Sequence, residues 1–212
     1  MSSIALATRR PVLADRIFSR SLVTDLVLIT AGTAFTALLA QVVIPLWPVP
    51  ITGQTLAVLL VGATLGMARG AASLGLYLVL GLVGLPVYAP QSDGSHLTGF
   101  IALAAPSFGY IVGFVVAAAL VGWLSERTWD RKFLKALATF VGGSLVVFAF
   151  GLPWLAVVTG ATLAQTFEWG FTPFIVGGLV KAVIAALLLP AAWWGADKIA
   201  ERRARDAAEQ RE

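Results

Sequence analysis

The sequence predicts an all-α integral membrane protein with six transmembrane helices and both termini in the cytoplasm. Of its 212 residues, 58% are hydrophobic and only 12% are charged, about half the charged share of ordinary soluble domains. Six apolar stretches are long enough to cross a bilayer, and the cations are unevenly distributed between the loops that join them. The alternating pattern of a transmembrane β-barrel is absent.

The lengths of the apolar runs give approximate bounds for the six helices. The helices are predicted near 22–46, 54–68, 70–85, 105–125, 135–159 and 173–197. The second and third are short, and a tight turn at 67–70 joins them. Residues 1–21 then form a cytoplasmic N-terminal segment, residues 22–197 the membrane domain and residues 198–212 a charged cytoplasmic tail. The N-terminal segment carries four arginines but lacks the apolar core of a signal peptide.

The cations of the chain follow this topology. Of the fifteen lysines and arginines, all but Lys181 lie in the N-terminal segment, the turn at 67–70, the loop between the fourth and fifth helices, or the C-terminal tail. The other three loops contain none. Because cytoplasmic loops carry an excess of Lys and Arg, this pattern places both termini in the cytoplasm. The net charge of +4 is therefore a topological signal and does not indicate nucleic-acid binding.

Lys181 lies inside the external half of the sixth predicted helix. Pro173 suits the first turn of that helix, which places Lys181 roughly 12 Å along it, within a hydrocarbon layer of about 30 Å. An ammonium at this depth costs several kcal/mol unless it snorkels to the surface, pairs, or meets water. The depth favours a solvated internal cavity, where a lone ammonium suits an anionic ligand such as a carboxylate. Gly177 and Gly178, one turn earlier, leave room for that ligand to approach the backbone.

Two of the external connections are predicted to cover this cavity. The connection at 45–54 contains three prolines and no charge, so it should be stiff and fold back over the cavity. The connection at 85–104 is long enough to act as a lid. Together they predict an external ligand pocket.

Polar and amphipathic residues close to these connections are further candidates for ligand contacts. The candidates are Thr52, Gln54, Thr55, Tyr88, Ser107 and Tyr110. The first three crowd the start of the second helix, where they either cap the helix or bind a ligand at its donor-rich N-terminus. The tyrosines are weaker candidates, because tyrosine at a membrane interface is ordinarily an anchor.

Small residues recur four apart along the first helix, at Gly32, Thr36 and Ala40. Such spacing lets helices approach closely in a membrane. The series either packs inside the bundle or faces a partner protein.

The sequence lacks the motifs of an enzyme. It has no cysteine and a single histidine, His96, so neither a disulfide nor a metal site is expected. It has no P-loop, no H-E-x-x-H motif and no Ser/His/Asp arrangement, and no cofactor is implied. A transporter of this kind must take its energy from a gradient or a partner. A partner is favoured, because Asp25 is the only acidic candidate for ion coupling within the spans.

Four segments of the membrane domain form a distinctive combination: PVPITGQTLAVLL at 48–60, GLVGLPVYA at 81–89, PSFGYIVGF at 106–114, and the stretch from Pro173 to Lys181. Together they resemble the BioY family, the biotin-specific substrate-binding subunits of energy-coupling factor transporters. The similarity covers about residues 26–190, which is nearly the whole membrane domain.

The resemblance implies a six-helix substrate-binding domain in the cell membrane that captures biotin in an external pocket without chemistry. It implies a transmembrane coupling protein and two ATP-binding subunits as partners, with the bundle toppling in the lipid to release biotin. Lys181 would contact the valerate carboxylate or the ureido oxygen, and Thr52, Gln54, Tyr88 and Tyr110 would add neutral hydrogen bonds. Gly32, Thr36 and Ala40 would form the face that docks on the coupling protein.

Two departures from the family pattern concern the pocket. The family often has an acidic residue three positions before the helix-six lysine, where this chain has Gly178. It often has a Gly-rich loop, sometimes with arginine, after helix three, where this chain has residues 90–96. Without an acidic neighbour, the substrate itself is the leading candidate to satisfy the charge of Lys181. The rival interpretations are a binding subunit for riboflavin, thiamine or pantothenate, and a membrane scaffold that transports nothing.

Overall fold

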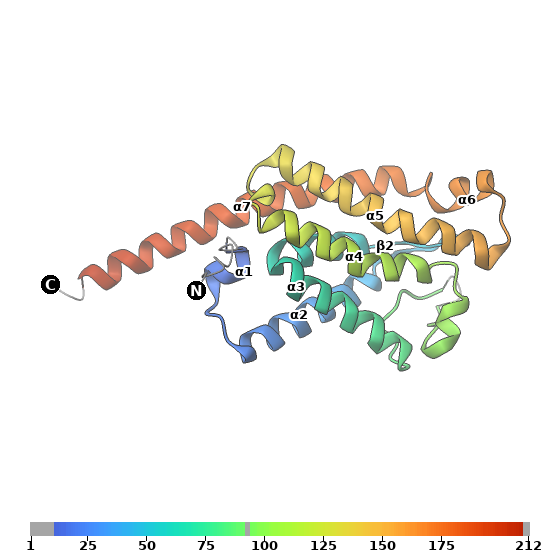
Figure 1. Cartoon of the computed structure of the whole chain (residues 1–212), viewed down its shortest axis with the longest axis horizontal. Coiled ribbons are helices and arrows are strands. Elements are labelled where there is room, and N and C mark those ends of the chain that lie inside the picture. The colour runs from blue at the N-terminus through green and yellow to red at the C-terminus, as the bar shows by residue number, and fades with distance from the viewer. Residues whose placement is uncertain (1–10, 92–93, 210–212) are drawn as a thin grey trace, which may run out of the picture.

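The computed structural model describes residues 11–91 and 94–209, with side chains up to residue 202 at the C-terminal end, and the described chain is almost entirely helical (Figure 1). Arg9, Arg10 and Arg211 of the predicted cytoplasmic segments lie outside the described residues. The α-helices are α1 (Leu13–Ile17), α2 (Leu22–Ala40), α3 (Gln54–Leu82), α4 (Phe108–Ser125), α5 (Phe133–Thr159), α6 (Leu163–Gly170) and α7 (Phe174–Glu209). Two 3-10 helices, η1 (Gly99–Ala104) and η2 (Trp129–Arg131), lie in the connections before and after α4.

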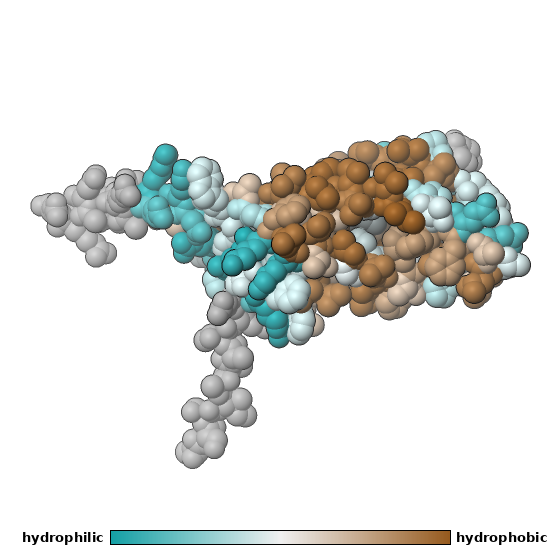
Figure 2. All heavy atoms as spheres, turned by 90° about the horizontal axis from the view of Figure 1, so that it is seen from above, coloured by the Kyte–Doolittle hydropathy of each residue, from teal (hydrophilic) through white to brown (hydrophobic). Residues whose placement is uncertain are grey.

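Five of these helices, α2, α3, α4, α5 and α7, are long and apolar enough to cross a membrane. Large apolar side chains such as Leu38, Val157 and Val176 point outward from them and are more than two-thirds exposed. On the face seen in Figure 2, hydrophobic side chains accordingly cover the middle of the bundle, between more polar ends. Exposure on this scale is stable in lipid, not in water. The chain is a multi-pass membrane protein.

Helix α3 folds back on itself at Gly66, so that it forms two antiparallel arms, residues 54–65 and 67–82. Gly66 has φ 85° and ψ 179°, a conformation outside the helical region. A hydrogen bond of 2.5 Å joins the side chains of Gln54 and Tyr77, which would lie about 34 Å apart in a straight helix. The second and third predicted helices are therefore present as the two arms.

The turn between the two arms lies slightly earlier than the sequence predicted. It is centred on Gly66 and not on 67–70, because only glycine readily adopts this backbone conformation. The first N–H of the second arm, that of Met67, is capped by Glu126 Oε1 at 3.0 Å, from the end of α4. This bond satisfies a donor that a helix start leaves free.

The first predicted helix ends earlier than expected, at Ala40. The chain then forms a short antiparallel hairpin in which Val43 pairs with Thr52 and Ile44 with Ile51. The N–H of Gly53 also donates to Val42 O at 2.9 Å. These bonds give the proline-rich connection a defined shape. The sequence predicted helix up to residue 46 because residues 41–46 are mostly apolar.

The last predicted helix is longer than expected, because α7 continues past residue 197 to Glu209 and projects beyond the other helices (Figure 1). Helix α6, within the connection at 160–172, was not predicted. Its N-cap is Thr162, which forms a capping box with Gln165. The remaining helices match their predicted positions within three residues at each end.

One end of the bundle, here called the α1 end, is tied together by charged residues. Asp15 of α1 accepts hydrogen bonds from Arg20 at 2.6 Å and from Arg69 of the second α3 arm at 2.9 Å. Burial of the carboxyl opposes its ionisation, but the hydrogen bonds from Arg20, the Val12 N–H and Arg69 hold the pKa of Asp15 below its ordinary value. The ion pair of Arg16 with Asp197, at 3.1 Å, joins α1 to α7.

A second polar contact at the α1 end is fully buried. Asp130 of η2 is 0% exposed, and its Oδ2 accepts a hydrogen bond of 2.6 Å from the indole N–H of Trp193 on α7. Burial raises the pKa of the Asp130 carboxyl, an effect that the Trp193 hydrogen bond and the nearby Arg131 charge only partly offset. The guanidinium of Arg131 covers the Trp193 ring at 4.0 Å.

The small residues of α2 pack inside the bundle. Thr36 and Ala40 are 0% exposed, and a Cβ on Gly32 would lie 2.7 Å from Ser73 Oγ on the second α3 arm. The expectation that Gly32, Thr36 and Ala40 form a docking face is therefore corrected. Their small size lets α2 approach α3 closely, which is internal packing.

We predict that Gly66→Ala destabilises the protein by about 1–3 kcal/mol, because alanine cannot adopt this backbone conformation without strain. The midpoint of thermal unfolding in detergent should fall by several degrees. The matched control is Gly75→Ala on the second arm, where a Cβ meets nothing within 4 Å and the midpoint should not fall. Equal midpoints for the two variants would contradict the proposed role of Gly66.

We also predict that Asp130 makes the stability depend on pH. Because the folded state raises its pKa, folding favours the protonated form, and the stabilising contribution of Asp130 is fully present below the ordinary pKa of 3.8. Stability should then decline as the pH rises through the higher folded-state pKa. Asp130→Asn removes this decline, so denaturation curves between about pH 4 and pH 8 should be flatter for the variant. Parallel pH profiles for the two proteins would show that Asp130 does not titrate in this range.

Candidate functional site

A cavity lies at the end of the bundle away from α1, and five segments of the chain line it. These are the proline-rich connection with the start of α3, the connection between α3 and α4, the first half of α4, the middle of α5, and the start of α7. The cavity holds about 890 Å³ of empty space, its open mouth included. Both connections that the sequence predicted to cover a cavity contribute to its wall.

The cavity brings together Lys181, Gly178 and every polar or amphipathic candidate that the sequence singled out for ligand contacts. Besides Lys181 and Gly178 these are Thr52, Gln54, Thr55, Tyr88, Ser107 and Tyr110. They come from distant parts of the chain: Thr52 and Lys181, which share a hydrogen bond, are 129 positions apart.

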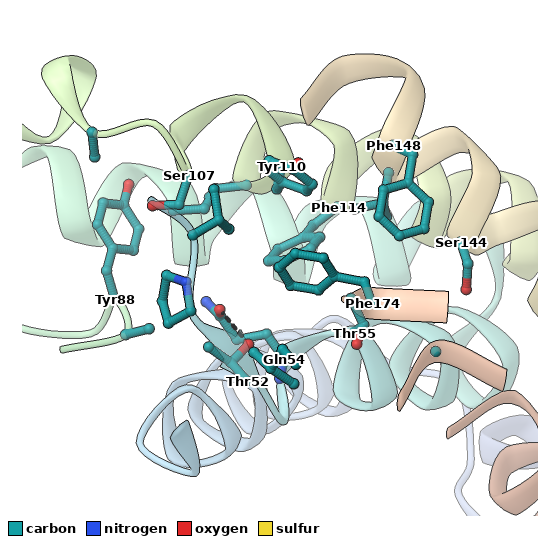
Figure 3. A pocket seen from close by; sticks show the side chains of 18 of the residues that line it. Thr52, Gln54, Thr55, Tyr88, Ser107, Tyr110, Phe114, Ser144, Phe148 and Phe174 are labelled. Carbon is teal, nitrogen blue, oxygen red and sulfur yellow. Dashed lines mark hydrogen bonds between the residues drawn. The ribbon is translucent and has the colours of Figure 1, made fainter. Parts of the chain in front are cut away.

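The polar groups are concentrated on one wall. Figure 3 shows Thr52, Gln54 and Thr55 side by side at the start of α3. The half-buried ammonium of Lys181 donates one hydrogen bond to the carbonyl oxygen of Thr52, at 2.5 Å, and another to Thr55 Oγ1, at 3.1 Å. Among the described residues it has no carboxylate partner. Two neutral oxygens hold the ammonium in place, and no described residue compensates its charge.

The opposite wall is aromatic. Phe114 and Tyr110 of α4, Phe148 of α5 and Phe174 of α7 face the polar residues across the cavity (Figure 3). The rings of Tyr110 and Phe174 are stacked with their centroids 6.2 Å apart, and Phe148 meets Phe174 edge-on at the same distance. The wall therefore offers an apolar surface for the body of a ligand.

The two tyrosines of the lining use their hydroxyl protons within the protein. Tyr88 Oη donates to Leu78 O at 2.6 Å, and Tyr110 Oη donates to Gly170 O at 2.8 Å. Burial raises the pKa of Tyr88 to about 12, so its hydroxyl stays protonated and keeps this bond. The family resemblance implied that both add neutral hydrogen bonds to a ligand. In this structure they offer their rings, and their hydroxyl oxygens remain only as acceptors.

Gln54 is held by a chain of side-chain hydrogen bonds. Thr52 Oγ1 donates to Gln54 Oε1 at 2.8 Å, and Gln54 Nε2 donates to Tyr77 Oη at 2.5 Å. Tyr77 Oη in turn donates to Val87 O at 3.0 Å, in the connection between α3 and α4. The chain thus joins the proline-rich connection, both arms of α3 and the predicted lid.

Gly178 keeps part of the cavity open. A Cβ at this position would meet nothing within 4 Å, so the space beside it is empty. The sequence predicted that Gly177 and Gly178 would leave room for a ligand, and Gly178 lines the cavity.

Sequence reasoning missed the aromatic wall and the hydroxyl of Ser144. Ser144, Val147 and Phe148 follow one another at helical spacing on α5, as do Tyr110 and Phe114 on α4. That periodicity is visible in the sequence, but apolar residues surround each helix on every side. The face that meets the cavity is therefore set by tertiary packing.

The arrangement suits capture of a small amphipathic molecule. Its ligand would place an apolar body against the aromatic wall, hydrogen-bonding groups against Thr52 and Gln54, and negative charge near Lys181.

Comparison with known proteins identifies the relatives of this chain. The sequence profile described as the BioY family matches residues 9–198. The chain belongs to the BioY family.

BioY proteins from several organisms are similar to it. The biotin transporter BioY of Rhizobium etli is 35% identical over 176 residues, which cover 75% of this chain and 91% of that protein. The biotin transporter BioY of Thermotoga maritima is 36% identical over 164 residues, covering 76% and 92%. A crystal structure of the S-component for biotin from an ECF-type ABC transporter superposes with a TM-score of 0.67 at 26% identity, covering 80% of this chain and 90% of that one.

Proposed function

We propose that this protein is the high-affinity biotin-binding subunit of an energy-coupling factor transporter for vitamin uptake, and that it is not an enzyme. The observation that carries the proposal is the cavity of this BioY-family chain, where the uncompensated ammonium of Lys181 and a polar wall face an aromatic wall. Its relatives named as biotin transporters, and its similarity to a biotin S-component, support the same conclusion.

Biotin has the three features that this cavity would recognise. Its carboxylate would compensate Lys181, and its fused rings would lie against the aromatic wall. Its ureido group carries both N–H donors and a carbonyl acceptor, which match the amide of Gln54 and the hydroxyl of Thr52. Thr52, Gln54, Tyr88, Ser107, Tyr110, Gly178 and Lys181 are thus the proposed ligand-binding residues.

Six membrane crossings follow if the two arms of α3 are counted separately. With α2, α4, α5 and α7 they bring both ends of the chain to one face of the membrane. The ion pair of Arg16 with Asp197 at the α1 end supports this arrangement. The concentration of cations in the segments of the α1 end supports a cytoplasmic location for it. The cavity would then open to the outside.

Energy for uptake would come from partner proteins. The chain carries no phosphate-binding motif, so we propose a transmembrane coupling protein and two ATP-binding subunits as partners, within the lipid of the cell membrane. Because Gly32, Thr36 and Ala40 are buried, a docking face on α2 would use its exposed side, which includes Ala31 and Ala34.

We expect Lys181→Met to weaken biotin binding about ten- to hundredfold, the effect of losing one charge-assisted hydrogen bond. The measurement is isothermal titration of purified protein in detergent with biotin and with biotin methyl ester. If Lys181 contacts the carboxylate, the wild type should prefer the acid to the ester, and the variant should not. If it contacts the ureido oxygen, both ligands should weaken equally.

Two outcomes of that titration would overturn the proposed function. One is the absence of saturable biotin binding to the wild-type protein. The other is displacement of biotin by riboflavin, thiamine or pantothenate at comparable concentrations, which would indicate a different vitamin.

We expect Gly178→Leu to abolish or strongly weaken biotin binding without unfolding the protein. A larger side chain would occupy the cavity, and overpacking of a filled site costs about 1–3 kcal/mol, or roughly tenfold or more in affinity. Thermal unfolding without ligand should change little, because the space beside Gly178 is empty. The matched control is Gly142→Leu on α5, which also has open space but lies outside the cavity lining. Equal biotin affinity for both variants would place the ligand elsewhere.

A further inference from the structure

Tyr77 is a buried polar residue in contact with the site but outside the cavity lining. Its side chain is 0% exposed and lies on the second arm of α3. Its hydroxyl contacts Gln54 Nε2 at 2.5 Å and Val87 O at 3.0 Å. A buried phenol with two such bonds needs an explanation beyond packing, because a phenylalanine would fill the same space.

The direction of the two bonds is determined by their atoms. Val87 O is a carbonyl oxygen and can only accept, so the single hydroxyl proton of Tyr77 is donated to it. Towards Gln54 the hydroxyl oxygen can then only accept. The carboxamide must therefore turn its Nε2 to Tyr77 and its Oε1 to Thr52, whose hydroxyl donates to it at 2.8 Å. A flipped amide would set two acceptor oxygens against each other at Tyr77.

This orientation decides what Gln54 can offer to a ligand. A carboxamide has two N–H donors and two acceptor lone pairs. Tyr77 takes one donor and Thr52 takes one lone pair, so that one N–H and one lone pair remain. A ureido group carries a donor and an acceptor along one edge and would pair with both. Turning the amide over would exchange the two positions and spoil the match.

Tyr77 also joins Gln54 to the connection that covers the cavity. Val87, whose carbonyl oxygen accepts the hydrogen bond from Tyr77, precedes Tyr88 of the lining. The ring of Tyr88 packs edge-on against Tyr77 with the centroids 5.5 Å apart. The same hydroxyl therefore positions both the amide and the backbone beside it.

We propose that Tyr77 is a positioning residue that fixes the orientation of the Gln54 carboxamide and thereby sets the selectivity of the cavity for a ureido ligand. This inference rests on the proposed function, because it concerns the same site. Tyr77 itself touches no ligand.

The test compares the affinities of wild type and Tyr77→Phe for biotin and for 2-iminobiotin, in which an imino N–H replaces the ureido oxygen. The wild type should prefer biotin, because its amide presents a fixed donor and acceptor. In Tyr77→Phe the amide is free to turn, so the preference should shrink at least about fivefold, largely through weaker biotin binding. A purely structural role for Tyr77 would weaken both ligands equally and leave their ratio unchanged.

Thr33→Val is the matched control. Thr33 of α2 has a buried hydroxyl that donates to the carbonyl oxygen of Ser73 at 2.8 Å. Ser73 lies one helical turn before Tyr77 on the second arm of α3. Thr33 itself lies outside the cavity lining. Its loss should lower the unfolding temperature but leave the ratio of the two affinities unchanged. Tyr77→Phe in a Gln54→Leu background completes the set. With no amide to orient, adding Tyr77→Phe to Gln54→Leu should not alter the ratio of the two affinities further. The double variant also serves if Tyr77→Phe alone folds poorly, because it contains no unpaired Gln54 amide.

The outcomes separate this inference from the proposed function. If the wild type binds biotin and Tyr77→Phe keeps the wild-type preference over 2-iminobiotin, the positioning role is overturned and the proposed function stands. A change in the ratio for Thr33→Val, or a further change in the Gln54→Leu background, would also overturn it. If the wild type does not bind biotin, the proposed function itself fails.

Discussion

The reversal of the chain at Gly66 is the constraint on which the arrangement of the cavity depends. A helix of 29 residues would otherwise separate its ends by about 42 Å, whereas here the connections at its two ends both line the cavity. Gln54 and Tyr77 can share a hydrogen bond only because the two arms run antiparallel. The same reversal leaves the polar turn at the α1 end, where Glu126 caps Met67 and Arg69 binds Asp15.

One wall of the cavity carries polar groups, and the opposite wall carries aromatic rings. In a medium of low dielectric constant an ammonium is stable only with oxygen partners, and the Thr52 carbonyl and Thr55 hydroxyl supply them to Lys181. Because both are neutral, no described residue compensates the positive charge of Lys181. The polar side chains of the wall also bond to one another, which limits the reorganisation needed when a ligand binds.

The α1 end shows a different use of charge. There Asp15 meets two arginines, and Asp130 receives the indole N–H of Trp193. These contacts join α1, η2, α3 and α7, which are distant in the sequence. They join these segments at the end of the bundle away from the cavity.

The sequence by itself determined the helical membrane fold, the approximate position of each long helix, and the residues of the polar wall. Long apolar runs and Lys181 carry this information locally, because lipid restricts the backbone to helices and makes a lone charge conspicuous. The family resemblance, confirmed by comparison, supplied the expected ligand.

Only the tertiary structure decided which faces meet. It buried Gly32, Thr36 and Ala40 against α3, placed Phe148 and Phe174 opposite Gln54, and ended α2 at Ala40 in favour of a hairpin. In a chain whose helices are apolar on all sides, hydrophobic periodicity cannot identify the inner face. Close packing and the pairing of a few polar groups make that choice, and both depend on residues far apart in the sequence.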